Sequence, residues 1–192
     1  MDIIDAIRAR RTIGKSSGEV ARDTVLELIE AATWAPNHKL TQPWRFTVVD
    51  GSAREELGRI WARRASAVVE ASARAAFIAG ESAKPLRAPT LVVVSVRTDA
   101  NPVTAEEDFA ATAAAVQNLL LAAHAKGLSA AWKTGKMIYD VVVKSFLSLD
   151  PPDRIVAIVY LGATALEEAA PRERDTHNCV HWIPELASAV AD

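Results

Sequence analysis

The sequence predicts a single domain, residues 1–192, that combines helices with strands. A chain of 192 residues is the size of one ordinary domain and buries about 70% of the surface that its unfolded form exposes. Trp44 to Val49, Leu91 to Val96 and Ile155 to Leu161 are short apolar runs of the kind that form strands. The segments between them carry apolar residues at helical spacing, which predicts helices around a sheet.

The first elements are helical. Ile3 to Arg8 is expected to form a short helix with Asp2 as its N-cap, and its arginines lie towards the end where the helix dipole favours cations. A second helix covers roughly Arg22 to Trp34. It should stop there, because Pro36 disfavours helical backbone at the residue before it.

The middle of the chain continues the alternation. The strand Trp44 to Val49 is followed by Asp50-Gly51, a dipeptide typical of turns. Ser52 with Glu55 has the spacing of a capping box and opens a long helical region that runs towards Gly80. Pro85 and Pro89 then interrupt the pattern, and the following run, Leu91 to Val96, is apolar on both faces, as in a buried central strand.

The second half adds one long helix and shorter elements. Thr104 with Glu107 has the spacing of a second capping box, and the alanine-rich helix after it should end at Gly127. Apolar residues go almost all the way round this helix, which predicts burial in the core or at a subunit contact. A strand at Leu128 to Trp132 and a helix near Tyr139 to Leu147 follow, and the last thirty residues read as an extended tail.

Composition excludes several classes of function. The formal net charge of -2 provides no basic field for nucleic acid. No apolar run approaches the ~18 residues of a membrane span and no signal peptide is recognisable, so we expect a cytoplasmic protein. Cys179 is the only cysteine, which excludes an intrachain disulfide, a dithiol pair and a thiolate zinc site. Redox chemistry would therefore need a bound cofactor.

Candidate binding groups come from a loop and from the N-terminal segment. The loop Trp34 to Phe46 (WAPNHKLTQPWRF) presents polar groups beside two tryptophans, a composition suited to a flat polar ring. No glycine-rich phosphate loop follows a strand, so side chains would have to hold a phosphate. Arginine is best fitted to that, because its planar fork donates two parallel hydrogen bonds, and Arg10 and Arg11 before Thr12 supply it.

These motifs together carry a resemblance. Arg10-Arg11-Thr12, the loop WAPNHKLTQPW, Trp132-Lys133-Thr134-Gly135 and Leu161-Gly162 occur in this order along essentially the whole chain. In this the chain resembles the nitroreductase family of FMN-dependent oxidoreductases, and most closely its short, minimal branch. The resemblance implies an α+β fold, with a central, mostly antiparallel sheet flanked by helices. It also implies a homodimer with FMN at the subunit interface and NAD(P)H as co-substrate.

The resemblance implies a first set of FMN contacts, at the phosphate. Arg10, Arg11 and Thr12 resemble the family's phosphate and ribityl contacts. Arg172 and Arg174 have the spacing of two tail cations that grip the phosphate in larger members.

A second set of implied contacts lies at the flavin ring. Trp34 stands where the minimal branch places an arginine next to the flavin, and His38 matches the position that reaches FMN across the dimer interface. Trp132, Lys133 and Thr134 resemble the segment that runs beside the cofactor.

The chain also departs from the family's pattern. Lys133 replaces an arginine, which keeps the charge but loses the bidentate fork. Position 14 is glycine, where larger relatives carry a lysine near the ring. The stretch Ala122 to Gly127 lies where the minimal branch has been linked to NAD(P)H.

Structural roles compete with these assignments. Taken alone, His38 is typical of a surface loop, and Trp44 opens a strand and belongs to the core. The alternating His177, Cys179 and His181 could face one way on a strand, but no further ligand is evident nearby, and we expect no metal site.

The predicted function is that of an FMN-dependent NAD(P)H oxidoreductase that reduces nitroaromatic, quinone or related acceptors by ping-pong hydride transfer. The chemistry takes place at FMN N5, so no side chain is assigned a catalytic role. Lys133 or the backbone beside it is the candidate for stabilising negative charge at the N1/C2-oxygen edge of the reduced flavin. Two alternatives remain open: a flavin-binding or flavin-sequestering protein with little turnover, and a purely structural α/β interaction protein.

Overall fold

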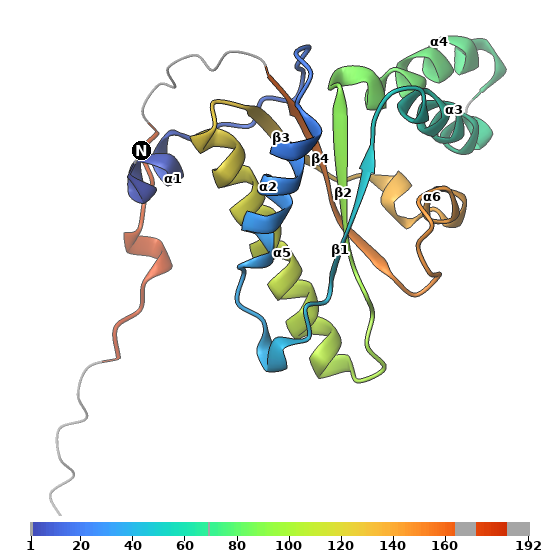
Figure 1. The fold of residues 1–192 in the computed structure, drawn as a ribbon. Helices are drawn as coiled ribbons and strands as arrows, with labels where there is room; N and C mark the ends of the chain where they lie inside the picture. Colours follow the sequence, from blue (N-terminus) through green and yellow to red (C-terminus); the bar gives the residue numbers. More distant parts are fainter. Residues whose placement is uncertain (1, 69, 164–171, 184–192) are drawn as a thin grey trace, which may run out of the picture.

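An antiparallel sheet forms the centre of the computed structural model, which describes residues 2–68, 70–163 and 172–183 (Figure 1). Its four strands lie in the order β1-β2-β4-β3, and each neighbouring pair is antiparallel. The strands are β1 (Trp44–Val49), β2 (Thr90–Val96), β3 (Ser129–Lys133) and β4 (Arg154–Gly162). This confirms the expected mostly antiparallel sheet.

Helices cover both faces of the sheet (Figure 1). Helices α2 and α5 lie on one face, and α1 contacts α5. On the other face α3 and α6 contact each other, and α4 packs against α3. The helices are α1 (Ile3–Ala9), α2 (Arg22–Thr33), α3 (Ala53–Ala65), α4 (Ala71–Ser82), α5 (Pro102–Ala125) and α6 (Val141–Phe146).

Strand β2 is buried along its whole length, as the run Leu91 to Val96 predicted. Successive side chains of a strand point to opposite faces. Val92 and Val94 accordingly join the core under α2 and α5, whereas Leu91 and Val93 join the core under α3 and α6. The strand therefore belongs to both apolar layers, which explains why it shows no polar alternation.

Several predicted helix boundaries are confirmed. The Asp2 carboxylate accepts a hydrogen bond from the Ile4 backbone N–H at 2.8 Å, as expected of an N-cap. Helix α2 ends at Thr33, with Trp34 as its C-cap. Gly127 follows the end of α5 with a φ of 72°, the left-handed conformation that a glycine reaches without strain.

Both predicted capping boxes are wrong. The Ser52 side chain makes no capping hydrogen bond to α3. Helix α5 begins before Thr104, because the Asn101 side chain accepts from the Val103 N–H at 2.9 Å and Pro102 occupies the first helical position. Proline is pre-organised for that position and has no N–H to satisfy, so this signal outweighs the spacing of Thr104 and Glu107.

The long helical region predicted from Ser52 towards Gly80 is two helices. Helix α3 ends at Ala65, a short 3₁₀ turn follows, and α4 folds back against α3. The two helices approach closely at Gly58, where a Cβ would lie 2.3 Å from the Ser82 carbonyl oxygen. The missing side chain at Gly58 thus allows this contact between backbones.

Two further expectations need adjustment. The helix expected near Tyr139 to Leu147 is a 3₁₀ turn (Lys136–Tyr139) followed by α6. In the described part of the tail, residues 172–183, His177–Cys179 form another 3₁₀ turn instead of continuous extended chain. In the described residues no helix has both the length and the apolar character needed to span a membrane.

Replacing Gly58→Ala should lower the free energy of unfolding by about 1–3 kcal/mol, because the added methyl group forces α3 and α4 apart. Gly80→Ala in α4 is the matched control, since a Cβ there meets nothing within 4 Å. The control should raise the free energy of unfolding by about 0.5–1 kcal/mol. Urea denaturation followed by circular dichroism measures both. Equal effects of the two substitutions would contradict the close approach at Gly58.

Candidate functional site

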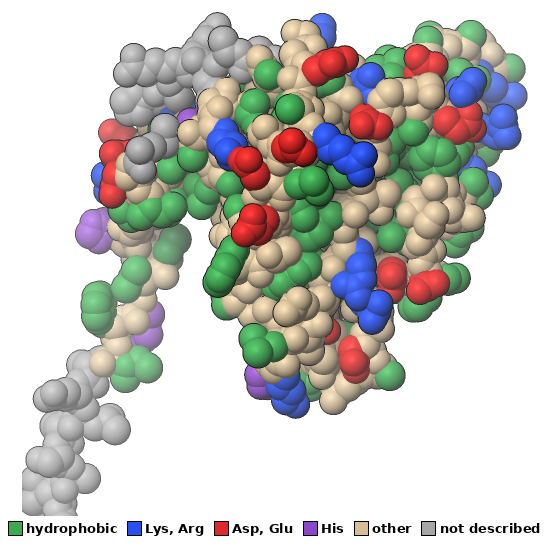
Figure 2. Space-filling view, viewed as in Figure 1, with side chains coloured by type: hydrophobic (Ala, Val, Ile, Leu, Met, Phe, Trp, Pro, Cys, Tyr) green, Lys and Arg blue, Asp and Glu red, His purple; other side chains and the backbone are tan. Residues whose placement is uncertain are grey.

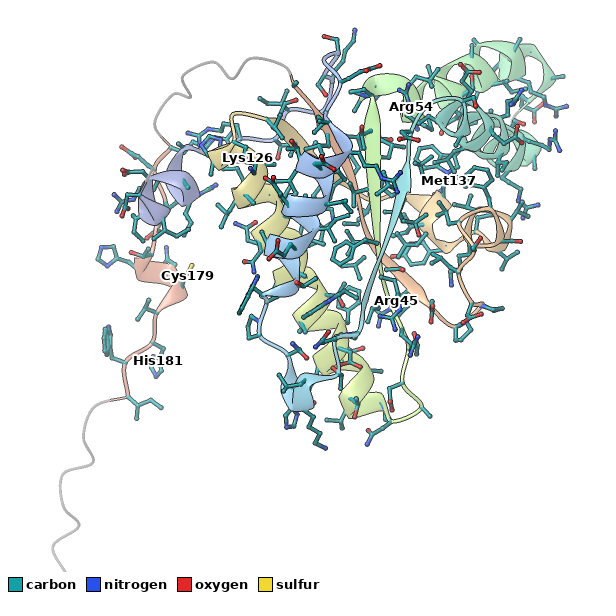
Figure 3. All side chains as sticks on the ribbon, in the orientation of Figure 1. Arg45, Arg54, Lys126, Met137, Cys179 and His181 are labelled. Carbon is teal, nitrogen blue, oxygen red and sulfur yellow. The ribbon has the colours of Figure 1, made fainter. Side chains whose placement is uncertain are left out.

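A cavity of about 620 Å³ lies between the β3–β4 half of the sheet and the α3–α4 pair. This volume is within the ~300–1,000 Å³ typical of small-molecule sites. Its wall comes from the N-terminal segment, from α3 and α4, from the turn before β2, from β3 with the turn after it, and from β4. The residues that form it are Gly14, Trp61, Arg64, Ala65, Phe77, Glu81, Lys84, Arg87, Lys133, Thr134, Gly135, Lys136, Met137, Ile138, Ile158 and Tyr160. Figure 3 labels one of them, Met137.

The end of β3 places Lys133 and Thr134, two of the predicted FMN contacts, in the cavity wall. Lys133 pairs with Ile158 of β4, and both line the cavity. The Trp132 side chain lies on the other face, where its indole Nε1 donates to the Val156 carbonyl oxygen at 3.1 Å and the ring packs with the core under α2 and α5. Only the backbone of Trp132 remains available to a ligand in the cavity.

The N-terminal segment passes along the edge of this cavity. The Ile13 N–H donates to the Ala130 carbonyl oxygen at 3.2 Å, and the Ser16 N–H donates to the Arg87 carbonyl oxygen at 2.8 Å. Between these two contacts lies Gly14.

The Lys133 ammonium group occupies the space beside Gly14. A Cβ on Gly14 would lie 3.1 Å from Lys133 Nζ. Gly14 is not among the glycines with a positive φ, so the space taken by Lys133, not backbone conformation, favours glycine here. Lys133 of β3 thus places a cation beside position 14.

Most of the charged residues in the cavity wall are basic. Arg64 Nε donates to the Asp140 carboxylate at 2.8 Å, and Lys84 pairs with Glu81 at 2.5 Å. Burial would raise the pKa of Asp140, but hydrogen bonds from Arg64 and from backbone N–H groups outweigh it and lower that pKa. The charged residues of the wall are the basic Arg64, Lys84, Arg87, Lys133 and Lys136 and the acidic Glu81. Such a wall favours the electron-rich edge of a ligand.

Two buried groups in the same wall offer neutral donors. Trp61 is 6% exposed, and its indole Nε1 is buried with no hydrogen-bond partner within the described ranges. Burial raises the pKa of Tyr160 to about 12, so the phenol is neutral at physiological pH. A buried donor without a partner is costly, and a polar ligand in the cavity would offer an acceptor.

Three arginines, Arg10 and Arg11 after α1 and Arg172 from the tail, lie close together. Burial, followed by the nearby charges of Arg11 and Arg172, lowers the pKa of Arg10. Neither Arg10 nor Arg172 forms an ion pair with any residue that the structure describes. The backbone from Arg10 to Gly14 is not helical, so these residues are at most about 14 Å apart. One ligand with a ring and a phosphate can therefore contact both places.

Trp34 and His38 do not line the cavity, and His38 lies far from the arginines. Trp34 is 79% exposed, and His38 Nδ1 is 2.8 Å from the Glu107 carboxylate near the start of α5. Arg10 instead lies close enough to His124, in the last turn of α5, to shift its pKa. Glu107 and His124 are 17 positions apart, which is about 25 Å along a helix. Figure 1 shows the loop after α2 and helix α1 near opposite ends of α5.

The loop that carries His38 is held in a strained conformation. Lys39, Leu40 and Gln42 have φ angles of 54°, 53° and 44°, which are uncommon for residues other than glycine. The Thr41 hydroxyl donates to the buried Asp108 carboxylate at 2.6 Å and so ties the loop to α5. Strain of this kind persists only where the surroundings hold it, and it is common at ligand sites.

The remaining predicted residues are exposed. Thr12 is exposed after the arginine pair, and Arg174 is exposed in the tail. His177, Cys179 and His181 are exposed too, and Figure 3 shows Cys179 and His181 in the segment that extends away from the sheet. The described residues contain no group of three metal-ligating side chains. On the face shown in Figure 2, basic and acidic side chains are interspersed, so no continuous basic surface appears there.

Sequence reasoning missed the far wall of the cavity. Trp61 and Phe77 come from the α3–α4 pair, Lys84 and Arg87 from the turn before β2, and Tyr160 from β4. The segment Lys-Pro-Leu-Arg before a buried strand was a usable signal, because it sets two cations on a turn beside the sheet. Nothing in the local pattern indicated which side chains of α3 and α4 would face the cavity.

Comparison with known proteins shows what the chain resembles. Residues 7–163 match the family described as the nitroreductase family. The protein named "Putative NAD(P)H nitroreductase YfhC" from Bacillus subtilis (strain 168) is 34% identical over 164 residues, which cover 82% of each chain. YdjA from Escherichia coli (strain K12), which bears the same kind of name, is 30% identical over 87% of this chain and 91% of its own.

Solved structures show the same similarity. A nitroreductase-like family protein from Bacillus cereus superposes with a TM-score of 0.82 at 28% identity, covering 95% of this chain and 96% of its own. A nitroreductase-type protein from Desulfovibrio desulfuricans, solved in complex with FMN, superposes with a TM-score of 0.72 at 27% identity, covering 96% of this chain and 98% of its own.

Proposed function

The chain belongs to the nitroreductase family, and from this premise we propose that it is an FMN-dependent NAD(P)H oxidoreductase that reduces nitroaromatic, quinone or related acceptors in a ping-pong cycle. One observation carries the proposal: a cavity lined by Lys133 and Thr134 lies within about 14 Å of converging arginines. This arrangement fits a flavin ring at one place and its phosphate at the other.

Arg10 and Arg172 are the proposed phosphate ligands. The like charges of Arg10, Arg11 and Arg172 repel one another, so a phosphate dianion would relieve that repulsion and accept hydrogen bonds from the guanidinium groups. Arg11 contributes charge while its Nη1 donates to the Arg8 carbonyl oxygen at 2.6 Å, at the end of α1.

Bound FMN supplies an N5 atom that accepts hydride from NAD(P)H and passes it to the acceptor. The protein's share is binding and electrostatics. Lys133, set beside Gly14, would stabilise negative charge at the N1/C2-oxygen edge of the ring, and Lys84 and Arg87 line the same cavity. Tyr160, neutral at physiological pH, would donate a hydrogen bond. None of these groups has to gain or lose a proton.

We further propose that two chains complete each site. Within one chain, His38 is separated from the arginines by most of the length of α5. Helix α1 beside those arginines exposes apolar side chains that suit a contact with a second copy; they are Ile3, Ile4 and Ile7. In a dimer, the strained loop of one chain would then reach the flavin held by the arginines of the other. A cytoplasmic location stays a prediction.

We expect the purified protein to be yellow, with about one FMN per chain, and to oxidise NADH or NADPH when menadione or a nitrofuran is added. Flavin absorbance after acid release and steady-state NAD(P)H oxidation measure the two properties. Bound flavin without acceptor-dependent oxidation would support the flavin-sequestering alternative instead. A colourless protein that takes up no FMN on incubation would contradict both readings.

The Arg10→Glu variant should lose the flavin, because a carboxylate replaces a phosphate ligand and repels the phosphate. Arg63→Glu is the matched control, since Arg63 is exposed on α3 and does not line the cavity. Full FMN occupancy in Arg10→Glu would remove the phosphate assignment.

The Lys133→Met variant should lower the two-electron reduction potential of the bound flavin by roughly 30–60 mV. Loss of a hydrogen bond to a charged group is worth about 1.5–3 kcal/mol, and ~1.4 kcal/mol corresponds to about 30 mV. Adding Gly14→Lys to this variant should restore much of the potential, because it returns a cation to the space that Lys133 Nζ occupied. Spectroelectrochemical titration measures these shifts.

Lys15→Met is the control for that series, since Lys15 is exposed, follows Gly14 directly and does not line the cavity. Its potential should match that of the unmodified protein. If Lys133→Met also leaves the potential unchanged, the ammonium group does not act on the flavin ring.

The protein should sediment as a dimer of about twice its 20.6 kDa chain mass. Flavin should be released as dilution separates the subunits, because each chain provides only part of a site. Analytical ultracentrifugation with detection at a flavin wavelength follows mass and cofactor together. A stable monomer that keeps its flavin would rule out the shared site.

A further inference from the structure

His124 lies in the last turn of α5, beside the arginines that follow α1. Helix α1 packs against α5, so the segment after α1 and the end of α5 are neighbours. The His124 ring is partly exposed, but its Nε2 atom is buried and has no hydrogen-bond partner within the described parts of the chain. A buried imidazole nitrogen without a partner is costly, so the site lacks an interaction that a ligand could provide.

The charges that surround His124 disfavour its protonated form. Burial, then Arg10 and then Arg11, lowers the pKa of His124 below its ordinary value. Arg172 from the tail acts on Arg10 and adds to the same positive field. At the C-cap of α5, the nearby Lys126 is paired with Glu27 of α2. The end of a helix favours a cation, and here burial and the arginines outweigh that preference.

We propose that His124 is a fourth member of the phosphate site and takes up a proton from solvent when the FMN phosphate binds. This inference rests on the proposed function, since it needs the phosphate at Arg10 and its neighbours. A dianion there would offset the repulsion from the arginines and would give a protonated Nε2–H an acceptor. His124 would then be neutral in the empty site and charged in the loaded one.

The proton uptake links FMN affinity to pH. The affinity gained through His124 is absent above the pKa of the loaded state and grows as the pH falls through it. The gain becomes constant below the pKa of the empty state. A difference of one unit between these two pKa values corresponds to tenfold in affinity. The FMN phosphate itself gains a proton near pH 6, so the effect has to be measured against a variant without the imidazole.

The experiment compares dissociation constants for FMN between pH 5.5 and 8.5, from the recovery of flavin fluorescence when the flavin-loaded full chain is diluted. The unmodified protein and His124→Gln should agree at pH 8.5, and the variant should bind about tenfold more weakly at pH 6. His181→Gln, which changes an exposed histidine in the tail, should follow the unmodified protein throughout. If the ratio of the FMN dissociation constants of His124→Gln and the unmodified protein does not change with pH, the proposal is overturned.

Calorimetry on the unmodified protein keeps the proposal testable if His124→Gln fails to fold. FMN binding to the full chain at pH 7.5, in buffers of different ionisation enthalpy, should show net proton uptake, and no uptake would overturn the proposal.

Two ligand comparisons separate this inference from the proposed function. Riboflavin lacks the phosphate, so its affinity should be weaker than that of FMN and should not depend on His124. Equal affinities for riboflavin and FMN would remove the phosphate site itself, and the proposal with it. If the protein strongly prefers FMN over riboflavin, but the ratio of FMN dissociation constants between His124→Gln and the unmodified protein does not change with pH, only the role of His124 is overturned. If His124→Gln changes the affinity for NADPH relative to NADH but leaves the affinity for FMN unchanged, His124 belongs to the dinucleotide site and the proposal is overturned.

Discussion

The burial of α5 between α2 and the sheet is the constraint on which the rest of the arrangement depends. Ala115, Val116 and Leu119 in its middle are almost inaccessible to solvent, so the helix can neither slide nor rotate without breaking the core. Its two ends therefore lie at fixed places. Glu107 and Asp108 hold the strained loop near one end, and His124 lies beside the arginines at the other. The separation of about 25 Å follows from helix geometry and keeps the proposed ligand contacts of each chain in two separate groups.

The basic groups follow one path across the chain. Arg10 and Arg172 begin it, the extended segment to Gly14 continues it, and Lys133 with Lys84 lies in the cavity beyond. The overall net charge of -2 hides this arrangement, because acidic residues elsewhere balance it. Local placement of cations, and not their number, thus makes the chain suitable for a phosphate at one end and an electron-rich ring edge at the other.

The sequence predicted those elements that depend on local physics. Burial on both faces identified β2, and the need for a left-handed residue identified Gly127 as the end of α5. The capping boxes failed because their spacing also occurs by chance, and at α5 the stronger signal came from Asn101 and Pro102. Successive side chains of a strand point to opposite faces, so those of Trp132 and Lys133 had to lie on different sides of the sheet. The family resemblance nevertheless assigned both residues to the same FMN contact.

The cavity could not be predicted because its wall depends on contacts between distant segments. Phe77 lines it because α4 folds back on α3, and the small residue at Gly58 allows that close contact. The same limit applied to Gly14. The sequence shows only that position 14 is not a lysine. The structure shows that the Lys133 side chain from β3 fills the space beside Gly14.

The strained loop after α2 and the exposed side chains around it suit a contact with a second molecule. Lys39 and Leu40 hold unfavourable backbone angles although they are not buried, and the Gln42 N–H closes the loop around them by donating to Asn37 Oδ1 at 3.0 Å. The contacts of Thr41 with Asp108 and of His38 with Glu107 fix only the base of the loop on α5. A conformation that is held from one side, and that presents Leu40 and Trp34 outwards, suits a surface prepared for a second molecule. Because the order is already present in the single chain, a partner would lose less conformational entropy on binding than it would with a flexible loop.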